Sequence, residues 1–132
     1  YPKTSGKKGR HLYVPIEPPG KAERTSEYAK AVARRLAEEH PRLIVAKMEK
    51  RLRKGKVFVD WSQNNPAKTT VAPYSLRAVS PPSVSTPITW DELESCEEAA
   101  GLVFSPDDVL GRVEKHGDLL EPLLDEDRPP LP

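Results

Sequence analysis

A short segment near the start of the chain, residues 4–11, combines several groups that bind anions. It reads Thr-Ser-Gly-Lys-Lys-Gly-Arg-His. Its two glycines let backbone amides approach an anion, while a hydroxyl, the two ammonium groups of Lys7 and Lys8 and the imidazole of His11 supply donors. The Gly-Lys-Ser/Thr ending of a P-loop is missing, and no helix pattern follows. The segment is therefore compatible with a phosphate cradle and also with a mobile loop.

An aspartate at the end of an apolar run is the second candidate. Residues 56–61 read Lys-Val-Phe-Val-Asp-Trp, which predicts a buried strand that ends in the carboxylate of Asp60. A carboxylate taken out of water needs a compensating cation, metal ion or hydrogen-bond donor, and hard divalent cations prefer carboxylate oxygens. An Asx turn with Ser62 or Gln63 is the structural alternative, and the sequence leaves both open.

The two halves of the chain carry opposite net charge. Residues 1–60 contain 16 Lys and Arg against 7 Asp and Glu, a net charge of +9, whereas residues 61–132 contain 5 against 13, a net charge of −8. A basic half suits a phosphate-bearing ligand such as a nucleotide or a nucleic acid, and a solvated charged surface is the alternative. Arg53 and Arg77 lie near predicted strand boundaries, where a guanidinium could bind a phosphate through two hydrogen bonds. Taken singly, each is also compatible with an ordinary surface arginine.

Three short stretches resemble the motifs of penicillin-recognising serine hydrolases. Residues 5–8 match S-x-x-K, residues 62–64 look like S-x-N, and residues 3–5 approximate K-T-G. However, S-x-x-K should begin a helix, which Gly6 and Gly9 disfavour. The K-T-G-like triplet overlaps it instead of lying on a separate strand. We therefore do not expect a serine hydrolase.

Length and composition limit the remaining classes of protein. The chain has 132 residues, which suits one domain. Leu, Ile, Val and Phe number 13, 3, 11 and 2, or 29 of 132 residues, which allows a thin core. No apolar run approaches the roughly 18 residues of a membrane helix, and no secretory signal is present, so we expect a cytoplasmic protein without a membrane partner. The single Cys96 and three histidines without metal-ligand spacing argue against a disulfide, a structural zinc site and a cysteine nucleophile.

Strand and helix signals follow one another along the first half. The β-rich run 11–16 predicts a strand that follows a polar loop over the first ten residues. Thr25 or Ser26 can cap a helix, which Pro41 stops. The residues expected to face the core from this helix are Tyr28, Val32, Ala33 and Leu36. Residues 43–52 are compatible with a strand or with a short helix.

The second half contains turn and helix-capping signals. Its composition predicts a turn at 62–68, a short element at 69–72 and an irregular segment, rich in Ser and Pro, at 79–87. Thr89 with Glu92 forms a capping-box pattern that begins a short helix. Residues 105–108, Ser-Pro-Asp-Asp, place a cap, a proline and two acids at the start of another helix. These acids complement the helix dipole, which gives them a structural purpose instead of a metal site.

Several of these stretches together resemble one protein family. They are Pro-Lys-Thr-Ser-Gly-Lys-Lys-Gly-Arg-His at 2–11, Gly-Lys-Val-Phe-Val-Asp-Trp-Ser-Gln-Asn at 55–64, Lys-Thr-Thr-Val-Ala-Pro-Tyr-Ser-Leu-Arg at 68–77 and Thr-Pro-Ile-Thr-Trp-Asp-Glu-Leu at 86–93. Their order resembles the polymerase domain of the bacterial ligase-D type, the archaeo-eukaryotic primase-like module of non-homologous end joining. The resemblance covers nearly the whole chain. It implies an α/β fold of the primase-like polymerase type, in which the sheet is mixed, as in α+β proteins.

The resemblance implies template-directed addition of nucleotides to a 3′ end, with ribonucleotides favoured. It also implies a two-metal site with Mn²⁺ or Mg²⁺, which activates the primer hydroxyl and stabilises the triphosphate. By motif correspondence, the residues that look substrate-binding are Ser5, Lys8, His11, Arg53 and Arg77. Asp60 looks like the third carboxylate of the metal site and is therefore the expected catalytic residue.

The resemblance also implies parts that these residues do not contain. The family's first metal motif, two aspartates separated by one residue, should precede Tyr1. We therefore expect residues 1–124 to be a C-terminal portion of the domain, incomplete by itself, followed by a tail or linker at 125–132. One carboxylate cannot hold two ions roughly 3.5–4 Å apart, so we expect the isolated chain to be inactive. We also expect it to expose apolar surface.

The expected partners follow from the same resemblance. They are DNA ends with a 5′-phosphate, a gap or an overhang, nucleoside triphosphates, the N-terminal part of the same domain, Ku and an ATP-dependent DNA ligase. A nucleoid-associated location in a bacterial cytoplasm follows. The alternative is a non-catalytic module that binds DNA ends or nucleotides. Its affinity would fall steeply with salt and would not depend on Asp60.

Overall fold

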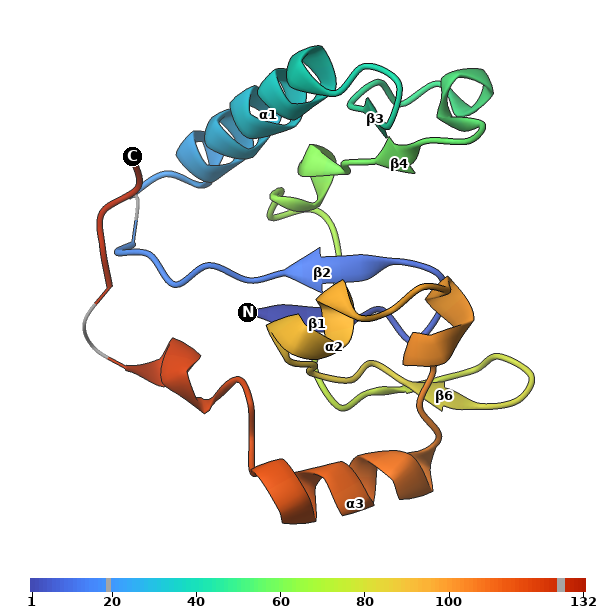
Figure 1. The fold of residues 1–132 in the computed structure, drawn as a ribbon. Coiled ribbons are helices and arrows are strands. Elements are labelled where there is room, and N and C mark those ends of the chain that lie inside the picture. Colours follow the sequence, from blue (N-terminus) through green and yellow to red (C-terminus); the bar gives the residue numbers. More distant parts are fainter. Residues whose placement is uncertain (19, 126–127) are drawn as a thin grey trace. The chain divides into compact units, whose positions relative to one another are not determined.

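The computed structural model describes residues 1–18, 20–125 and 128–132, and it divides into two compact units (Figure 1). Unit 1 consists of Tyr1–Pro15 and Val71–Arg128, and unit 2 consists of Ile16–Thr70 and Pro129–Pro132. The strands are β1 (Pro2–Thr4), β2 (Arg10–Leu12), β3 (Ile44–Val45), β4 (Val57–Phe58), β5 (Leu76–Arg77) and β6 (Ser83–Val84). The α-helices are α1 (Ala22–Glu39), α2 (Trp90–Glu94) and α3 (Pro106–His116), and the 3₁₀ helices are η1 (Lys50–Arg53), η2 (Trp61–Gln63), η3 (Ala99–Leu102) and η4 (Glu121–Leu124).

Unit 1 is held together by pairing between the start of the chain and residues 83–88. Strands β1 and β2 form an antiparallel hairpin in which Lys3 lies opposite His11. Strands β5 and β6 form a second antiparallel pair. The segment after β6 then runs beside β1, where the amide of Thr4 donates to the carbonyl of Thr86 at 2.8 Å. Two distant parts of the sequence therefore form one layer.

The core of unit 1 is small and contains buried polar side chains. Its buried apolar residues are Val84, Ile88, Leu102, Val109 and Leu120. Beside them lie Lys3, Thr4, Ser83, Ser85 and Thr86, each with 0–1% of its surface exposed. A polar group taken out of water costs free energy unless it is hydrogen-bonded. Hydrogen bonds among these residues are therefore part of what stabilises the unit.

Both α-helices of unit 1 begin with the capping boxes that the sequence predicts. The hydroxyl of Thr89 accepts from the amide of Glu92 at 3.1 Å, and the Glu92 carboxylate accepts from the amide of Thr89 at 2.8 Å. Ser105 and Asp108 form the same reciprocal pair at the start of α3. Each pair satisfies amides that have no partner inside the helix.

Unit 2 packs α1 against β3 and η2. Alanine, leucine and long charged side chains favour a helix over residues 22–39. The helix ends before Pro41, as predicted, because the residue before a proline is disfavoured in the α conformation. Ala33 of α1 is fully buried. Strands β3 and β4 pair in parallel, with the buried Val45 opposite Phe58.

Several predicted boundaries in the first half are wrong. The strand predicted at 11–16 is limited to Arg10–Leu12, because its partner β1 offers only three residues for pairing. That partner, Pro2–Thr4, was predicted as part of a polar loop. Residues 43–52, left open between strand and helix, contain β3 and then the first residues of η1.

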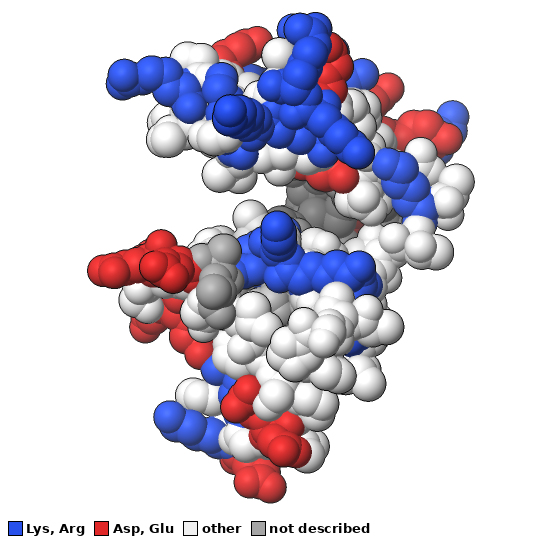
Figure 2. Space-filling model, turned by 90° about the vertical axis from the view of Figure 1, so that its right-hand side faces the viewer, with Lys and Arg blue, Asp and Glu red and all other residues white. Residues whose placement is uncertain are grey.

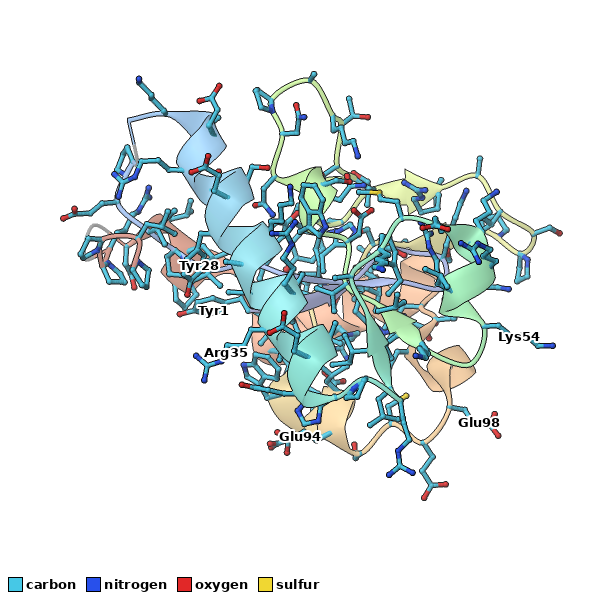
Figure 3. The ribbon with its side chains drawn as sticks, turned by 90° about the horizontal axis from the view of Figure 1, so that it is seen from above. Tyr1, Tyr28, Arg35, Lys54, Glu94 and Glu98 are labelled. Atoms are coloured by element: carbon cyan, nitrogen blue, oxygen red, sulfur yellow. The ribbon has the colours of Figure 1, made fainter. Side chains whose placement is uncertain are left out.

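The start and the core-facing side of α1 also differ from the prediction. The helix begins at Ala22, so Thr25 and Ser26 lie inside it and do not cap it. Of the residues expected to face the core, only Ala33 is buried. The others are the half-buried Leu36 and the exposed Tyr28 and Val32. Unit 2 therefore exposes apolar side chains on α1, as expected, and Figure 3 shows Tyr28 and Arg35 on this helix.

Three predictions for the middle of the chain are wrong. Residues 56–61 do not form a buried strand, since β4 has only two residues and Val57 is 65% exposed. Residues 69–72 contain no helix or strand. The segment 79–87, expected to be irregular, contains β6, because its side chains at 83–86 are buried against the start of the chain.

No helix in the described residues is long and apolar enough to cross a membrane. The tail predicted at 125–132 includes residues 126 and 127, which lie outside the described residues. In its described part, the carbonyl of Pro129 accepts from the amide of Glu17 at 2.9 Å, so this part is hydrogen-bonded to unit 2.

A half-buried ion pair joins α2 and α3 in unit 1. The guanidinium of Arg112 donates to both oxygens of the Glu92 carboxylate and, at 3.2 Å, to the carbonyl of Pro87. It also lies 4.6 Å from the centre of the Phe104 ring. The hydrogen bonds from Arg112 lower the pKa of Glu92 from its ordinary 4.5 to about 2, although partial burial acts in the opposite direction.

Replacing Arg112 with Met should destabilise the fold by about 2 kcal/mol at neutral pH, because Glu92 stays charged and loses its partner. The difference should shrink as pH falls from about 4.5 toward 2. A carboxylate whose pKa is lowered by folding stabilises the folded state above its unfolded pKa, and this contribution is lost as pH falls through the folded pKa. Urea denaturation at several pH values measures both effects. Lys115→Met, on the exposed side of α3, is the control, and equal midpoints for the two variants at neutral pH would contradict the prediction.

Candidate anion-binding site

The loop between β1 and β2 is a tight turn organised by Ser5. The Ser5 hydroxyl oxygen accepts from the amides of Lys7 at 3.2 Å and Gly9 at 3.1 Å, and the Ser5 amide donates to the carbonyl of Gly9 at 2.9 Å. Gly6 has a φ of +70°, a conformation that favours glycine. Two amides that were predicted to approach an anion therefore bond to Ser5 instead. The groups that this loop offers to an anion are mainly side chains.

Lys3, His11 and Arg77 come together next to this loop. Lys3 and His11 are opposite each other in the β1–β2 pair, and the Cγ atom of Arg77 packs against Gly6 where a Cβ atom would be. Burial and the charge of Arg77 lower the pKa of Lys3 from 10.5 to about 8. Burial and the charges of Lys3 and Arg77 lower the pKa of His11. The charges of Lys3 and Arg77 together create a positive potential that attracts an anion.

No carboxylate compensates this cluster in the described part of the chain. The salt bridges found there join Arg35 to Glu39, Arg51 to Glu49 and Arg112 to Glu92. The ammonium of Lys3 donates to two uncharged oxygens, Ser85 Oγ and, at 3.4 Å, the carbonyl of Thr4. The Nδ1 atom of His11 is buried without a hydrogen-bond partner. Buried charge and unpaired polar atoms are costly, and no carboxylate of the described residues offsets that cost here.

Buried hydroxyl groups at β6 hold the loop in place. The hydroxyl of Ser83 donates to the carbonyl of Gly6, and that of Ser85 donates to the carbonyl of Thr4 at 2.8 Å. The amide of Thr86 donates to the hydroxyl of Thr4 at 2.9 Å. These bonds attach β1 and the loop to the chain some 80 residues later, which gives the loop a defined position.

Further positive charge surrounds the loop at the surface. The side chain of Lys8 is exposed at the turn, and the guanidinium of Arg10 donates to the carbonyl of Gly9 at 3.0 Å. Figure 2 shows Lys and Arg side chains on the visible face of each unit. Four of the predicted site residues lie in this loop or next to it in unit 1, namely Ser5, Lys8, His11 and Arg77.

Asp60 lies in unit 2 and forms the Asx turn that was the structural alternative. Its Oδ1 accepts from the amide of Ser62 at 3.1 Å and from the Ser62 hydroxyl at 2.6 Å, and its Oδ2 accepts from Gln63 Nε2 at 3.1 Å. The residue is exposed, so the expected desolvated carboxylate at a buried strand end is wrong. Partial burial would raise its pKa, but the hydrogen bonds from Ser62 and Gln63 and the charge of Lys68 hold that pKa below the usual value. Asp60 is therefore an ionised carboxylate with a fixed orientation.

Arg53 also lies in unit 2, and its side chain is half-buried. Its guanidinium lies 3.7 Å from the centre of the Phe58 ring and donates to the carbonyl of Met48. Its Nε atom is buried without a hydrogen-bond partner. A guanidinium that lies over an aromatic ring keeps N–H groups available for a carboxylate or a phosphate. This geometry differs from that of an ordinary surface arginine.

The described residues do not form a metal site by themselves. They contain no group of three His, Cys, Asp or Glu side chains that could hold an ion. Asp60 offers one ionised carboxylate, which is a suitable ligand for Mn²⁺ or Mg²⁺. Two ions need several such ligands, so the predicted two-metal site is not complete within these residues.

Sequence reasoning missed Lys3 as a member of the cluster. The sequence shows only a lysine in a polar stretch before the glycines, which gives no sign of a buried strand. Its hydrogen-bond partner Ser85 is 82 residues away, in a segment predicted to be irregular. Only the pairing between these two segments reveals that Lys3 is buried.

Residues 1–120 match the sequence profile of the LigD primase-polymerase domain. The chain belongs to this family. It is 53% identical over 129 residues to the multifunctional non-homologous end joining protein LigD of Mycolicibacterium smegmatis, covering 98% of this chain and 16% of that protein. It is 32% identical over 118 residues to the bifunctional non-homologous end joining protein LigD of Bacillus subtilis, covering 89% of this chain and 19% of that protein.

The LigD primase-polymerase fold is confirmed by a solved structure. The polymerase domain from Mycobacterium tuberculosis ligase D, in complex with DNA, matches with a TM-score of 0.87 and 50% sequence identity. The match covers 97% of this chain and 43% of that chain. The chain thus spans less than half of the solved domain and about 16% of the mycobacterial LigD proteins. The predicted α/β, primase-like polymerase fold is therefore confirmed.

Gly6→Ala should destabilise this LigD-type loop by roughly 1–3 kcal/mol. The φ of Gly6 is +70°, and an added Cβ would meet the Arg77 side chain and lie 3.2 Å from the amide nitrogen of Ser85. Gly111→Ala is the matched control, because nothing lies within 4 Å of a Cβ there and α3 should gain about 0.5–1 kcal/mol. Thermal unfolding compares the two variants. A melting temperature of Gly6→Ala at or above that of the unchanged protein would show that the loop does not require glycine.

Proposed function

We propose that this chain is part of a DNA repair polymerase of bacterial non-homologous end joining. The intact domain adds nucleotides to the 3′ end of a primer on a template strand, fills gaps at double-strand breaks, and favours ribonucleotides. In this phosphoryl transfer the 3′ hydroxyl oxygen bonds to the α-phosphorus, and the bond to the leaving pyrophosphate breaks. Membership of the LigD primase-polymerase family supports the proposal.

The observation that carries the proposal is the positive cluster of Lys3, His11 and Arg77 beside the Ser5 loop, for which the described residues supply no carboxylate partner. A nucleoside triphosphate carries several negative charges and many acceptor oxygens, which suit this cluster. In our proposal Arg77 and the exposed Lys8 bind phosphate oxygens, and the hydroxyl of Ser5 and the ring of His11 hydrogen-bond to them. We also propose Arg53, in unit 2, as a substrate-binding residue.

We propose that Asp60 contributes one carboxylate to a Mn²⁺ or Mg²⁺ site whose other ligands lie outside the described residues. Bound divalent ions supply activation of the primer hydroxyl and neutralisation of phosphate charge. The hydrogen bonds from Ser62 and Gln63 orient the Asp60 carboxylate, and its lowered pKa keeps it ionised at neutral pH. These properties support a ligand role for Asp60.

The proposed partners extend beyond the nucleotide. DNA ends are supported by the solved relative, a polymerase domain in complex with DNA, and by the relatives' description as non-homologous end joining proteins. We also propose the N-terminal part of the same domain, Ku and an ATP-dependent DNA ligase as partners. In this proposal residues 1–124 belong to the polymerase domain and residues 125–132 to a linker.

A non-catalytic module that binds DNA ends or nucleotides is the second candidate. It is favoured by the Asp60 carboxylate, both of whose oxygens already accept hydrogen bonds within its own turn. Such a module would bind through the Lys and Arg side chains. Its affinity would fall steeply with salt and would not change when Asp60 is replaced.

Asp60→Asn should reduce primer extension by at least about 100-fold, because an amide keeps the turn but is a poor metal ligand. The assay uses the full-length protein with Mn²⁺ and ribonucleotides on a gapped duplex with a 5′-phosphate. Asp91→Asn, at an exposed position on α2, is the matched control and should leave extension unchanged. Unchanged extension by Asp60→Asn would contradict the ligand role. Binding of the duplex without extension by the unchanged protein would favour the second candidate.

The proposed ribonucleotide preference has its own test. We expect a higher kcat/KM for ATP than for 2′-deoxyATP in single-nucleotide addition opposite a template thymine. Both substrates carry the same triphosphate, so the difference reports contacts to the sugar and not to the positive cluster. Equal kcat/KM values would remove the preference from the proposal and leave the polymerase activity in place.

A further inference from the structure

Lys3 is the member of the positive cluster that cannot reach a bound nucleotide. It is 0% exposed in the middle of β1. Its ammonium is hydrogen-bonded to Ser85 Oγ and to the carbonyl of Thr4, and it lies 5.7 Å from the centre of the Tyr13 ring. Any effect of Lys3 on an anion at the Ser5 loop must therefore pass through its neighbours or through its electric field.

An apolar side chain would occupy the position of Lys3 at a lower cost to folding. Burying an ammonium without a carboxylate partner is unfavourable, and a well-packed apolar residue of similar volume is often neutral or stabilising in its place. The nearby positive group is Arg77, whose charge acts against that of Lys3 and lowers the pKa of Lys3. The positive charge at this position is therefore poorly explained by stability.

The contacts of Lys3 link it to the loop in two ways. Its ammonium donates to Ser85 Oγ, which in turn donates to the carbonyl of Thr4, the residue before Ser5. Its charge also acts on a group assigned to the anion, because the charge of Lys3 lowers the pKa of His11. Lys3 therefore contributes both to the position of the loop and to its potential.

We propose that Lys3 is a positioning residue of the triphosphate site, where its buried charge strengthens the attraction for phosphate and its hydrogen bond to Ser85 holds the loop against β6. This inference rests on the proposed function, since it takes the loop to bind phosphate. It adds a residue that never touches the substrate. It also makes phosphate binding depend on the protonation of a buried lysine.

The groups that face Lys3 determine the pH at which this dependence is visible. They are His11 in β2, Tyr13 directly after β2, Arg77 in β5 and the uncharged Ser85 next to β6. Burial and Arg77 lower the pKa of Lys3 to about 8, whereas burial raises the pKa of Tyr13 and the pKa of His11 lies below 6.5. Among these groups Lys3 is the one that loses its charge between about pH 7.5 and 9.5. Affinity for a polyphosphate should fall over that range.

The test measures binding of inorganic tripolyphosphate to the full-length protein by calorimetry at pH 7.5 and 9.5. The variants are Lys3→Met, which removes the charge, and Lys3→Arg, which keeps a charge that does not titrate in this range. Lys115→Met, at an exposed position of unit 1, is the control. At pH 7.5 we expect Lys3→Met to bind roughly tenfold more weakly than the unchanged protein. Between the two pH values the unchanged protein and Lys115→Met should lose affinity, while neither Lys3 variant should.

A purely structural role for Lys3 would give different results. Wild-type affinity in Lys3→Met would overturn the inference, and so would a fall with pH that persists in Lys3→Arg or an absence of tripolyphosphate binding by the unchanged protein. If Lys3→Met does not fold, the unchanged protein is compared with Lys3→Arg. A fall in affinity with pH in both proteins would then overturn the inference. In primer extension, Lys3→Met should raise the KM for the nucleotide by roughly tenfold and change kcat by less than about threefold.

The same samples separate this inference from the proposed function. Lys3-dependent binding of tripolyphosphate without primer extension by the unchanged protein would overturn the polymerase proposal and support the inference. Primer extension with the same KM in Lys3→Met as in the unchanged protein would overturn the inference and support the polymerase proposal.

Discussion

The hydrogen-bonded contact between β1 and the segment that follows β6 is the interaction on which unit 1 depends. A strand of three residues is too short to be stable with one neighbour, and β1 obtains a second neighbour from residues some 80 positions later. Thr4 is bonded to Thr86 through both its amide and its hydroxyl. Because small hydroxyl side chains fill this interface, the two segments come close enough for the carbonyl of Gly6 to accept from Ser83. The loop that follows β1 is therefore held from two sides.

The same contact determines the electrostatics of the candidate site. It buries Lys3 beside His11 and Arg77 in a region where the described residues supply no carboxylate. The hydroxyl of Ser85 and the carbonyl of Thr4 accept hydrogen bonds from the ammonium but leave its charge uncompensated. In our proposal this composition makes the site preorganised for an anion, which reduces the reorganisation needed for binding.

Unit 2 holds a single carboxylate and a single guanidinium in fixed orientations. Asp60 is fixed by donors from Ser62 and Gln63, within three residues of it in the chain. Arg53 is held by the ring of Phe58. Both arrangements use neighbours close in sequence, so they need only the local turn and the short β3–β4 pair. The Asx turn of Asp60 is therefore compatible with the ligand role proposed from the family. A turn that fixes the orientation of a carboxylate can also hold it toward a metal ion.

The sequence by itself determined the family, the loop that contains Ser5, the capping box at Thr89 and the end of α1 before Pro41. These features depend on residues within a few positions of one another, since caps, prolines and tight turns act on the nearest backbone groups. Only the tertiary structure decided that residues 2–4 form a strand and that Lys3 is buried against Ser85. A three-residue polar strand carries no periodic pattern, and its burial comes from a segment that the chain reaches some 80 residues later. Long-range pairing of this kind is decided by the sum of contacts in the folded chain and not by any local signal.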